Sequence, residues 1–331
     1  MDNVNEFFAT LSSCLWGWPM IVLLLGTHVF LTIRLRFPQR KLFTAIRLSV
    51  QRDKSQKGDV SQFGALATAL AATIGTGNII GVATAVALGG PGAVFWCWLT
   101  GVFGISTKYS EALLAIKYRV KSEGGHMQGG PMYTLERGLG WRKMGTLFAV
   151  FTAIAAFGIG CTVQANAIST IMHASYGIST EVCGGVLMLL AAAVIIGGVK
   201  SISRVCSMLV PFMALLYVLG CIYILYVNGS YVAPALKLII SSAFSPEAAG
   251  GGFAGGSVIM AARYGIARGL FSNESGLGSA PIVAAAARTK NPVRQALVSS
   301  TGTFWDTVVI CALTGLVIVS SIIAYPDIDY S

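Results

Sequence analysis

The chain has 331 residues, of which 55% are hydrophobic and 11% are charged. A soluble domain carries about 25% charged residues, so this composition excludes an ordinary soluble enzyme or binding domain. Several apolar runs reach the roughly 20 residues that cross a bilayer core, which indicates a protein that spans a membrane several times. The net charge of +10 fits either nucleic-acid binding or the excess of Lys and Arg in cytoplasmic loops.

Eight apolar segments are predicted to span the bilayer, and they define an all-α polytopic membrane protein. They lie at residues 14–35, 61–88, 91–117, 145–172, 180–199, 206–228, 252–287 and 297–324. A basic connector at 36–60 has the apolar spacing of a helix that lies on the membrane surface. A polar loop at 118–143 is expected to contain a short helix from about Met132, and a weaker apolar segment follows at 229–250.

The second span is interrupted by the sequence Gly75-Thr76-Gly77-Asn78. Each glycine weakens a helix by about 0.8–1 kcal/mol relative to alanine, and backbone groups freed within a bilayer need internal partners. Such a break is tolerated where it is buried in protein or lines a cavity, so it indicates a binding site. The alternative is a glycine-rich helix crossing, because Gly77 and Gly81 form a GxxxG pair.

The seventh apolar segment also requires a break. Residues 252–287 would form one helix about 54 Å long at about 1.5 Å per residue, whereas a bilayer core is about 30 Å thick. The sequence FSNESGLGSAP at 271–281 is the expected position of this break.

The Lys and Arg residues gather in alternate loops, beginning with the connector at 36–60. Cytoplasmic loops carry this excess, so we expect a protein of the inner (plasma) membrane whose N terminus lies outside the cytoplasm. The positive charge is then explained by topology, and no nucleic-acid partner is expected. The two broken spans then run in opposite directions, which suggests an inverted repeat. Residues 1–60 form an N-terminal span and connector, residues 61–228 a first five-helix repeat, and residues 252–331 the start of a second repeat.

The two halves of the second span have ends of opposite polarity. The first half ends near Thr73 and Ile74 with free carbonyl groups, and the second begins near Gly77 and Asn78 with free N–H groups. An amino-acid carboxylate suits the N–H end. A sodium ion suits oxygen ligands, which the carbonyls, Thr76 and Asn78 provide.

Three stretches read GTGNIIGVATAVALGGPGAVFWCW at 75–98, GGPMYTLERGLG at 129–140 and ARGLFSNESGLGSAP at 267–281. They resemble the motifs of the alanine or glycine:cation symporters, the sodium:alanine symporter family, with Cys97 in place of a methionine. The resemblance implies a leucine-transporter-like inverted repeat with one extra leading helix. That fold has three more spans than are predicted here, so the second repeat is expected to be incomplete.

The resemblance also extends the candidate site. It implies that Phe271 packs on the substrate side chain and that Gln164 meets the substrate, whereas the sequence alone favours an interhelical hydrogen bond for Gln164. In the related fold, carbonyls near Ala71 and Ile74 contribute to a second sodium site. The candidate substrate-binding residues are Thr76, Gly77, Asn78, Gln164, Phe271, Ser272 and Asn273. The candidate cation-binding residues are Ala71, Thr73, Ile74 and Asn78.

Two acidic residues within the predicted spans leave alternatives open. Glu274 balances an ammonium group or a cation, or else it pairs with Arg268 or Arg263. The cost of an unpaired buried charge favours the pairing. Asp306 lies near the middle of the last span, where it is either functional or paired with an arginine of the seventh segment, and it is not included in the site.

Lys108 and Glu111 stand three residues apart near the inner end of the third span. At this spacing they share one helical face. We expect a pair at the membrane surface, with the lysine reaching toward the interface.

These features predict a sodium-coupled symporter that imports small neutral amino acids by alternating access around the two broken spans. The resemblance implies alanine and glycine as substrates. We expect a monomer in the lipid bilayer, with sodium as the co-transported ion, no cofactor and no other metal. The sequence has no recognisable set of nucleophile and base, so an enzyme is not expected. The remaining alternative is a transport-inactive fragment or membrane scaffold that lacks the last three spans.

Overall fold

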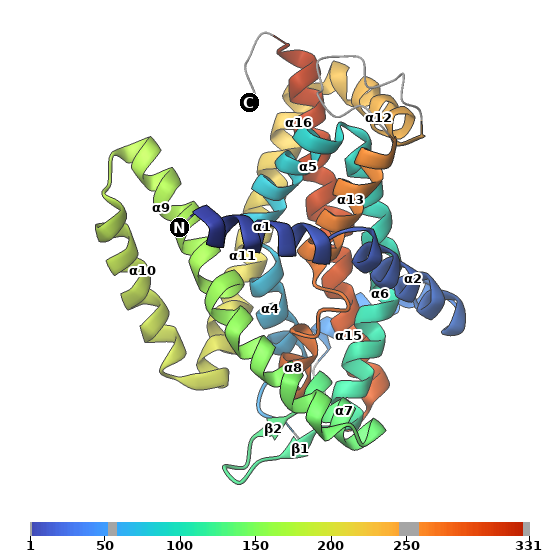
Figure 1. Cartoon of the computed structure of the whole chain (residues 1–331), viewed down its shortest axis with the longest axis vertical. Coiled ribbons are helices and arrows are strands. Elements are labelled where there is room, and N and C mark those ends of the chain that lie inside the picture. Colours follow the sequence, from blue (N-terminus) through green and yellow to red (C-terminus); the bar gives the residue numbers. More distant parts are fainter. Residues whose placement is uncertain (1, 52–57, 245–257, 327–331) are drawn as a thin grey trace.

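The computed structural model describes residues 2–51, 58–244 and 258–326, which form a bundle of helices (Figure 1). The α-helices are α1 (Asp2–Leu15), α2 (Trp18–Arg34), α3 (Leu42–Val50), α4 (Gln62–Thr73), α5 (Val82–Gly89), α6 (Gly92–Lys117), α7 (Pro131–Leu139), α8 (Arg142–Ala155), α9 (Val163–Tyr176), α10 (Thr180–Ile195), α11 (Gly198–Val227), α12 (Gly229–Phe244), α13 (Val258–Asn273), α14 (Ala280–Ala285), α15 (Pro292–Thr303) and α16 (Ala312–Ala324). Other helical turns are η1 (Pro38–Lys41), η2 (Gly77–Gly81), η3 (Ala156–Thr162) and η5 (Phe304–Cys311), and an antiparallel hairpin pairs β1 (Val120–Lys121) with β2 (Met127–Gln128). The prediction of a mostly helical protein is confirmed.

Four continuous helices in the described part of the chain are long and apolar enough to cross a membrane. They are Glu6–Arg34, Arg142–Tyr176, Gly198–Val227 and Pro292–Ala324. A fifth candidate is the bent pair formed by Gln62–Thr73 and Gly77–Gly89. The predicted fifth span corresponds to the shorter apolar helix α10, and the weaker segment at 229–250 corresponds to α12 as far as Phe244, since residues 245–250 lie outside the described residues. A total of eight crossings therefore stays a prediction.

Helix α6 is the predicted third span, and other helices surround it. It packs against α2, α12, α13, α14, α15 and α16. Polar side chains on α6, including Thr100, Ser106 and Thr107, are buried in these contacts. A helix covered by protein does not need the apolar surface that lipid requires. This explains why α6, with 26 residues, is long enough to cross a bilayer but is not among the apolar spanning helices.

Two glycines of α13 allow its close contact with α6. A Cβ atom added at Gly269 would lie 2.8 Å from the Cβ of Thr100 and 2.9 Å from the carbonyl oxygen of Cys97. A Cβ atom at Gly265, one turn earlier, would also meet the α6 backbone. Gly265 and Gly269 are a GxxxG pair, so the packing that this motif favours in membranes is found at the α6–α13 crossing.

Both predicted helix breaks are present. In the second segment, α4 ends at Thr73 and η2 begins at Gly77, and the two parts meet at an angle of 54°. In the seventh segment, α13 ends at Asn273 and α14 begins at Ala280. The predicted start of the seventh segment, residues 252–257, lies outside the described residues.

Backbone hydrogen bonds join the start of the second segment to the end of the seventh. The N–H of Asp59 donates to the carbonyl of Ala286 at 2.8 Å, and the N–H of Arg288 donates to the carbonyl of Val60 at 2.7 Å. Val60 and Ala287 form a parallel bridge between these bonds. The two broken segments are therefore tied together at one end of the bundle.

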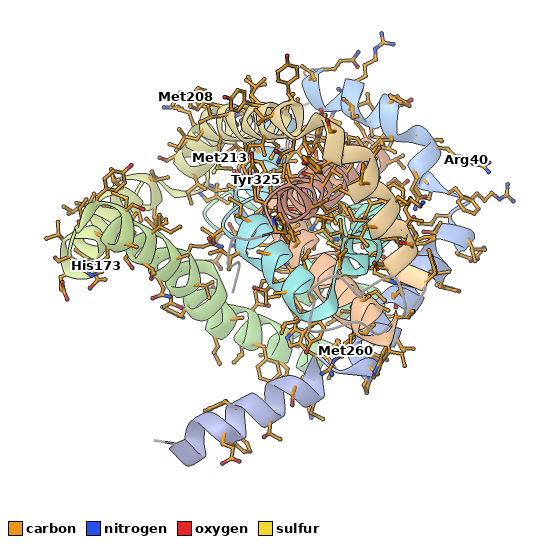
Figure 2. The ribbon with its side chains drawn as sticks, turned by 90° about the horizontal axis from the view of Figure 1, so that it is seen from above. Arg40, His173, Met208, Met213, Met260 and Tyr325 are labelled. Carbon is orange, nitrogen blue, oxygen red and sulfur yellow. The ribbon has the colours of Figure 1, made fainter. Side chains whose placement is uncertain are left out.

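Helices α8, α9 and α10 lie at one side of the bundle, and Figure 2 shows His173 at their outer side. Their side chains are largely exposed: Ile154 of α8 has 64% of its surface exposed and Leu189 of α10 has 67%. A continuous apolar surface of this kind suits lipid. The predicted short helix after Met132 is α7, which packs against α8.

The α6–α13 crossing can be tested with a Gly269→Ala substitution. The added methyl group has no room against Thr100 and Cys97, so overpacking should lower the free energy of unfolding by about 1–3 kcal/mol. Thermal unfolding of the purified protein in detergent measures this effect. The matched control is Gly184→Ala in α10, where nothing lies within 4 Å of the added Cβ. Equal stability of the two variants would contradict the crossing.

Candidate functional site

A cavity of about 660 Å³ lies between the two broken segments and α9. It is lined by Trp16, Thr76, Gly77, Ile80, Gly81, Thr84, Ala85, Val163, Gln164, Ala167, Tyr264, Ala267, Arg268 and Phe271. Four of the residues predicted for substrate binding meet here, namely Thr76, Gly77, Gln164 and Phe271. Its size and its mixed lining of apolar and polar groups are typical of small-molecule sites.

Gln164 reaches from α9 to the break in the second segment. The hydroxyl of Thr76 donates to Oε1 of Gln164 at 2.6 Å. A Cβ atom added at Gly75 would lie 3.4 Å from the same oxygen. Gln164 therefore makes an interhelical hydrogen bond and also lines the cavity. The two roles considered for this side chain are compatible.

Two of the lining residues that were not predicted for the site, Trp16 and Arg268, contact Phe271. The ring of Trp16 meets the ring of Phe271 edge to face, with centroids 5.9 Å apart. The guanidinium of Arg268 also lies over the Phe271 ring, with its Cζ atom 5.4 Å from the ring centroid. An arginine within an apolar segment is itself a signal of function, but here it was assigned as a partner of Glu274.

Three polar side chains from different helices form a second, buried part of the site. Asn78 Nδ2 donates to Asp306 Oδ1 at 2.7 Å and to Ser272 Oγ at 3.2 Å. Ser272 Oγ in turn donates to Asp306 Oδ2 at 2.9 Å. The exposed fractions of Asn78, Ser272 and Asp306 are 1%, 4% and 0%. We call these three residues the buried polar cluster.

The carboxylate of Asp306 is the centre of the buried polar cluster. It also accepts a hydrogen bond of 2.7 Å from the hydroxyl of Thr307. Of the two alternatives for Asp306, an ion pair with an arginine of the seventh segment is not found among the described residues. The buried Lys108 is near enough to interact electrostatically with Asp306 but makes no ion pair with it. A buried carboxylate that is surrounded by hydroxyl and amide groups offers oxygen ligands to a hard cation.

The structure divides the predicted substrate residues between two places. Asn78 and Ser272 belong to the buried polar cluster and do not line the cavity. Asn273 also points away from the cavity, because its Oδ1 accepts a hydrogen bond from the N–H of Ser275. Successive residues at a helix end project in different directions, and sequence position alone did not separate these residues from Phe271.

The predicted cation residues before the break lie in varied surroundings. Ala71 is exposed and Ile74 is buried. Thr73 lines a small second cavity together with Lys108 and Asn273. The hydroxyl of Thr73 lies 3.4 Å from the carbonyl oxygens of Ala69 and Leu70 in its own helix.

The expected surface pair of Lys108 and Glu111 is wrong. Lys108 is 3% exposed, and its Nζ donates to the carbonyl of Asn273 at 2.7 Å, where α13 ends. The carboxylate of Glu111 lies beside the backbone N–H groups of Gly276 and Gly278 in the same break. A basic side chain thus meets the carbonyl end of a half-helix and an acidic side chain lies beside free N–H groups, as the helix dipole favours.

The expected pairing of Glu274 with Arg268 or Arg263 is also not found among the described residues. Glu274 has a positive φ of 52°, and its carboxylate accepts a hydrogen bond from the hydroxyl of Ser279. Glu274 therefore stabilises the break locally, by closing the loop between α13 and α14. Proximity in sequence favoured the arginines, but they lie on the helical side of the break.

Two broken apolar helices, a cavity between them and a buried carboxylate beside it define a helical membrane protein of the transporter class. The sequence profile of the sodium:alanine symporter family matches residues 1–329, and the chain belongs to this family. The family and its named members indicate cation-coupled amino-acid symport across a membrane.

Relatives with assigned and unassigned substrates are similar to the chain. The sodium/alanine symporter AgcS of Methanococcus maripaludis is 52% identical over 336 residues, which cover 99% of this chain and 73% of the relative. An uncharacterized transporter of Haemophilus influenzae is 53% identical over 319 residues, covering 96% and 70%. A probable sodium/glutamine symporter, GlnT of Bacillus subtilis, is 38% identical over 324 residues, covering 97% and 67%.

The role of Lys108 at the break can be tested with Lys108→Met. The variant keeps the length of the side chain but leaves the carbonyl of Asn273 without its donor. The free energy of unfolding should fall by about 1–3 kcal/mol, the cost of an unsatisfied buried polar group. Thermal unfolding measures this, with Lys117→Met as the control because Lys117 is exposed at the end of α6. Unchanged stability of Lys108→Met would rule out this role.

Proposed function

We propose that the protein is a sodium-coupled symporter of small neutral amino acids, alanine and glycine among them, and that it works by alternating access. One observation carries this proposal: the carboxylate of Asp306 is fully buried beside the breaks of both interrupted segments. A buried carboxylate without a paired cationic side chain is costly unless a cation joins it. The cavity next to it offers room for an organic substrate.

Sodium is proposed to bind at the buried polar cluster. The carboxylate of Asp306 supplies charge and oxygen ligands, and the hydroxyl of Ser272 and the side chain of Asn78 complete the polar surroundings. Binding would replace the hydrogen bonds that these groups make to one another. The carbonyl groups near Ala71 and Ile74, together with Thr73, remain our proposal for a second cation position.

The amino acid is proposed to bind in the cavity, in contact with the break at Thr76 and Gly77. Gln164 supplies an amide at the cavity wall, and Phe271 supplies an apolar surface for a small side chain. Ser272 and Asn273 would act indirectly, by fixing the end of α13 beside the cation. When both ligands bind beside the two broken helices, both can shift the equilibrium between the inward-facing and outward-facing arrangements of these helices.

The architecture that suits this mechanism is a leucine-transporter-like inverted repeat with one extra leading helix. We propose that residues 61–228 form the first repeat, that a second begins at 252, and that residues 1–60 provide the leading span and connector. The matching breaks in α4–η2 and α13–α14 support this division. The alternating Lys and Arg content supports an N terminus outside the cytoplasm. We propose that the protein is a monomer in the plasma membrane.

The energetics of one sodium ion are sufficient for uptake. One cation that crosses a potential of about 100 mV releases about 2.3 kcal/mol. Since about 1.4 kcal/mol corresponds to a tenfold concentration ratio, this alone sustains roughly a 40-fold gradient of amino acid.

The proposed function can be tested by uptake of labelled alanine into proteoliposomes. We expect uptake with a sodium gradient and none when choline replaces sodium, because choline cannot occupy a compact oxygen site. Glycine should compete for uptake. Uptake that does not depend on sodium would contradict the coupling, and absence of uptake with sodium would contradict the function.

Asp306→Asn tests the cation site directly. The amide keeps the shape of the carboxylate but removes its charge, so sodium affinity should fall at least about tenfold, or about 1.4 kcal/mol. Alanine binding measured at increasing sodium concentrations reports this affinity. The matched control is Asp59→Asn, because Asp59 lies outside the spans and pairs with His126. An unchanged sodium affinity in Asp306→Asn would exclude the buried polar cluster as the cation site.

A further inference from the structure

Arg268 occupies a groove that the second segment forms with its glycines. Its Nη2 donates to the carbonyl of Gly77, immediately after the break. A Cβ atom added at Gly81 would overlap the Cζ, Nη1 and Nε atoms of Arg268. The Gly77–Gly81 pair therefore faces the guanidinium of Arg268 and not the backbone of another helix. It provides the space in which the guanidinium of Arg268 lies against the helix backbone.

The charge of Arg268 is unbalanced in the described part of the structure. The ion pairs of the described residues, His126–Asp59 and Arg142–Glu136, do not include it. Its Nε is buried without a hydrogen-bond acceptor. The guanidinium also lies over the ring of Phe271, so one of its faces is covered by an aromatic side chain.

The surroundings of Arg268 match the recognition of a carboxylate. Arginine presents a fork of N–H donors that fits a carboxylate through two parallel hydrogen bonds. Of these donors, Nη2 is the one that bonds to a described residue, and its acceptor is an uncharged carbonyl. A carboxylate in the cavity would be a stronger acceptor than this carbonyl, because hydrogen bonds between two charged groups are stronger.

We propose that Arg268 binds the α-carboxylate of the transported amino acid, and that Gly81 keeps the space in which the guanidinium can turn toward it. In the absence of substrate the guanidinium holds the carbonyl of Gly77. When the carboxylate arrives, the guanidinium exchanges that carbonyl for the substrate, and the backbone at the break is released. This inference rests on the proposed function, since it assigns a recognition residue to the cavity in which the amino acid binds.

The test compares two ligands that differ in the carboxylate alone. L-alaninamide keeps the ammonium and methyl groups of L-alanine but replaces the carboxylate with an amide. Binding of labelled L-alanine to the purified protein in sodium, with either unlabelled ligand as competitor, gives both affinities. The wild-type protein should prefer alanine by about 30-fold, as expected for hydrogen bonds between charged groups.

Arg268→Gln should reduce this preference to about threefold or less, by weakening alanine and leaving alaninamide nearly unchanged. Arg268→Lys, which keeps the charge but not the fork, should give an intermediate preference. The matched control is Arg263→Gln on the same helix. Arg263 stacks on Tyr264 and does not line the cavity, so the preference should stay at the wild-type value.

Gly81→Ala provides an independent variant that retains the arginine. The added methyl group occupies the position of the guanidinium, so alanine affinity should fall while alaninamide affinity stays the same. Should Arg268→Gln fail to fold, Arg268→Lys and Gly81→Ala decide the question. A wild-type preference for alanine that persists in the Arg268 and Gly81 variants would overturn the inference alone. Absence of sodium-dependent alanine binding by the wild type would overturn the proposed function and this inference with it.

Discussion

The structure depends on the satisfaction of backbone groups that are freed where two helices break inside the bundle. In a bilayer such groups have no access to water, and each unsatisfied one is costly. At the break of the seventh segment, Lys108 donates to the carbonyl of Asn273, and Glu111 lies beside the N–H groups of Gly276 and Gly278. Both charges come from α6. The central helix of the bundle, α6, therefore supplies the side chains that stabilise the break in the seventh segment.

At the break of the second segment, the same requirement is met by residues that also face the proposed ligand sites. Asn78 Oδ1 accepts a hydrogen bond from the N–H of Gly75 at 2.8 Å, while its amide nitrogen contacts Asp306. Arg268 contacts the carbonyl of Gly77 and lines the cavity. The side chains that support the backbone here are the ones proposed to recognise ligands, so a ligand that displaced one of these contacts would change the stability of the break.

Much of the arrangement could be predicted from the sequence, because its signals are local. Glycines inside an apolar run and a segment too long for one span located both breaks, and the meeting of Thr76 with Gln164 agrees with the site that the motifs implied. The partners of charged residues could not be predicted in this way. Lys108 contacts a carbonyl 165 positions away, and Asp306 contacts Asn78 across 228 positions. Such contacts depend on how the helices pack against one another, so they cannot be predicted from the residue pattern of a single segment.

The polar character of α6 has a consequence for the biogenesis of the protein. On insertion scales, charged side chains within a helix oppose its entry into the bilayer, most strongly at the centre of the helix. A helix that carries Lys108 and Glu111 is therefore a poor candidate for independent release from the translocon into lipid. The short connection from α5 to α6, through Gly90 and Pro91, lets the two helices enter as a hairpin. The backbone partners of Lys108 and Glu111 lie at the end of α13 and in the loop after it. The packing of α6 can therefore be completed only after these residues have been synthesised.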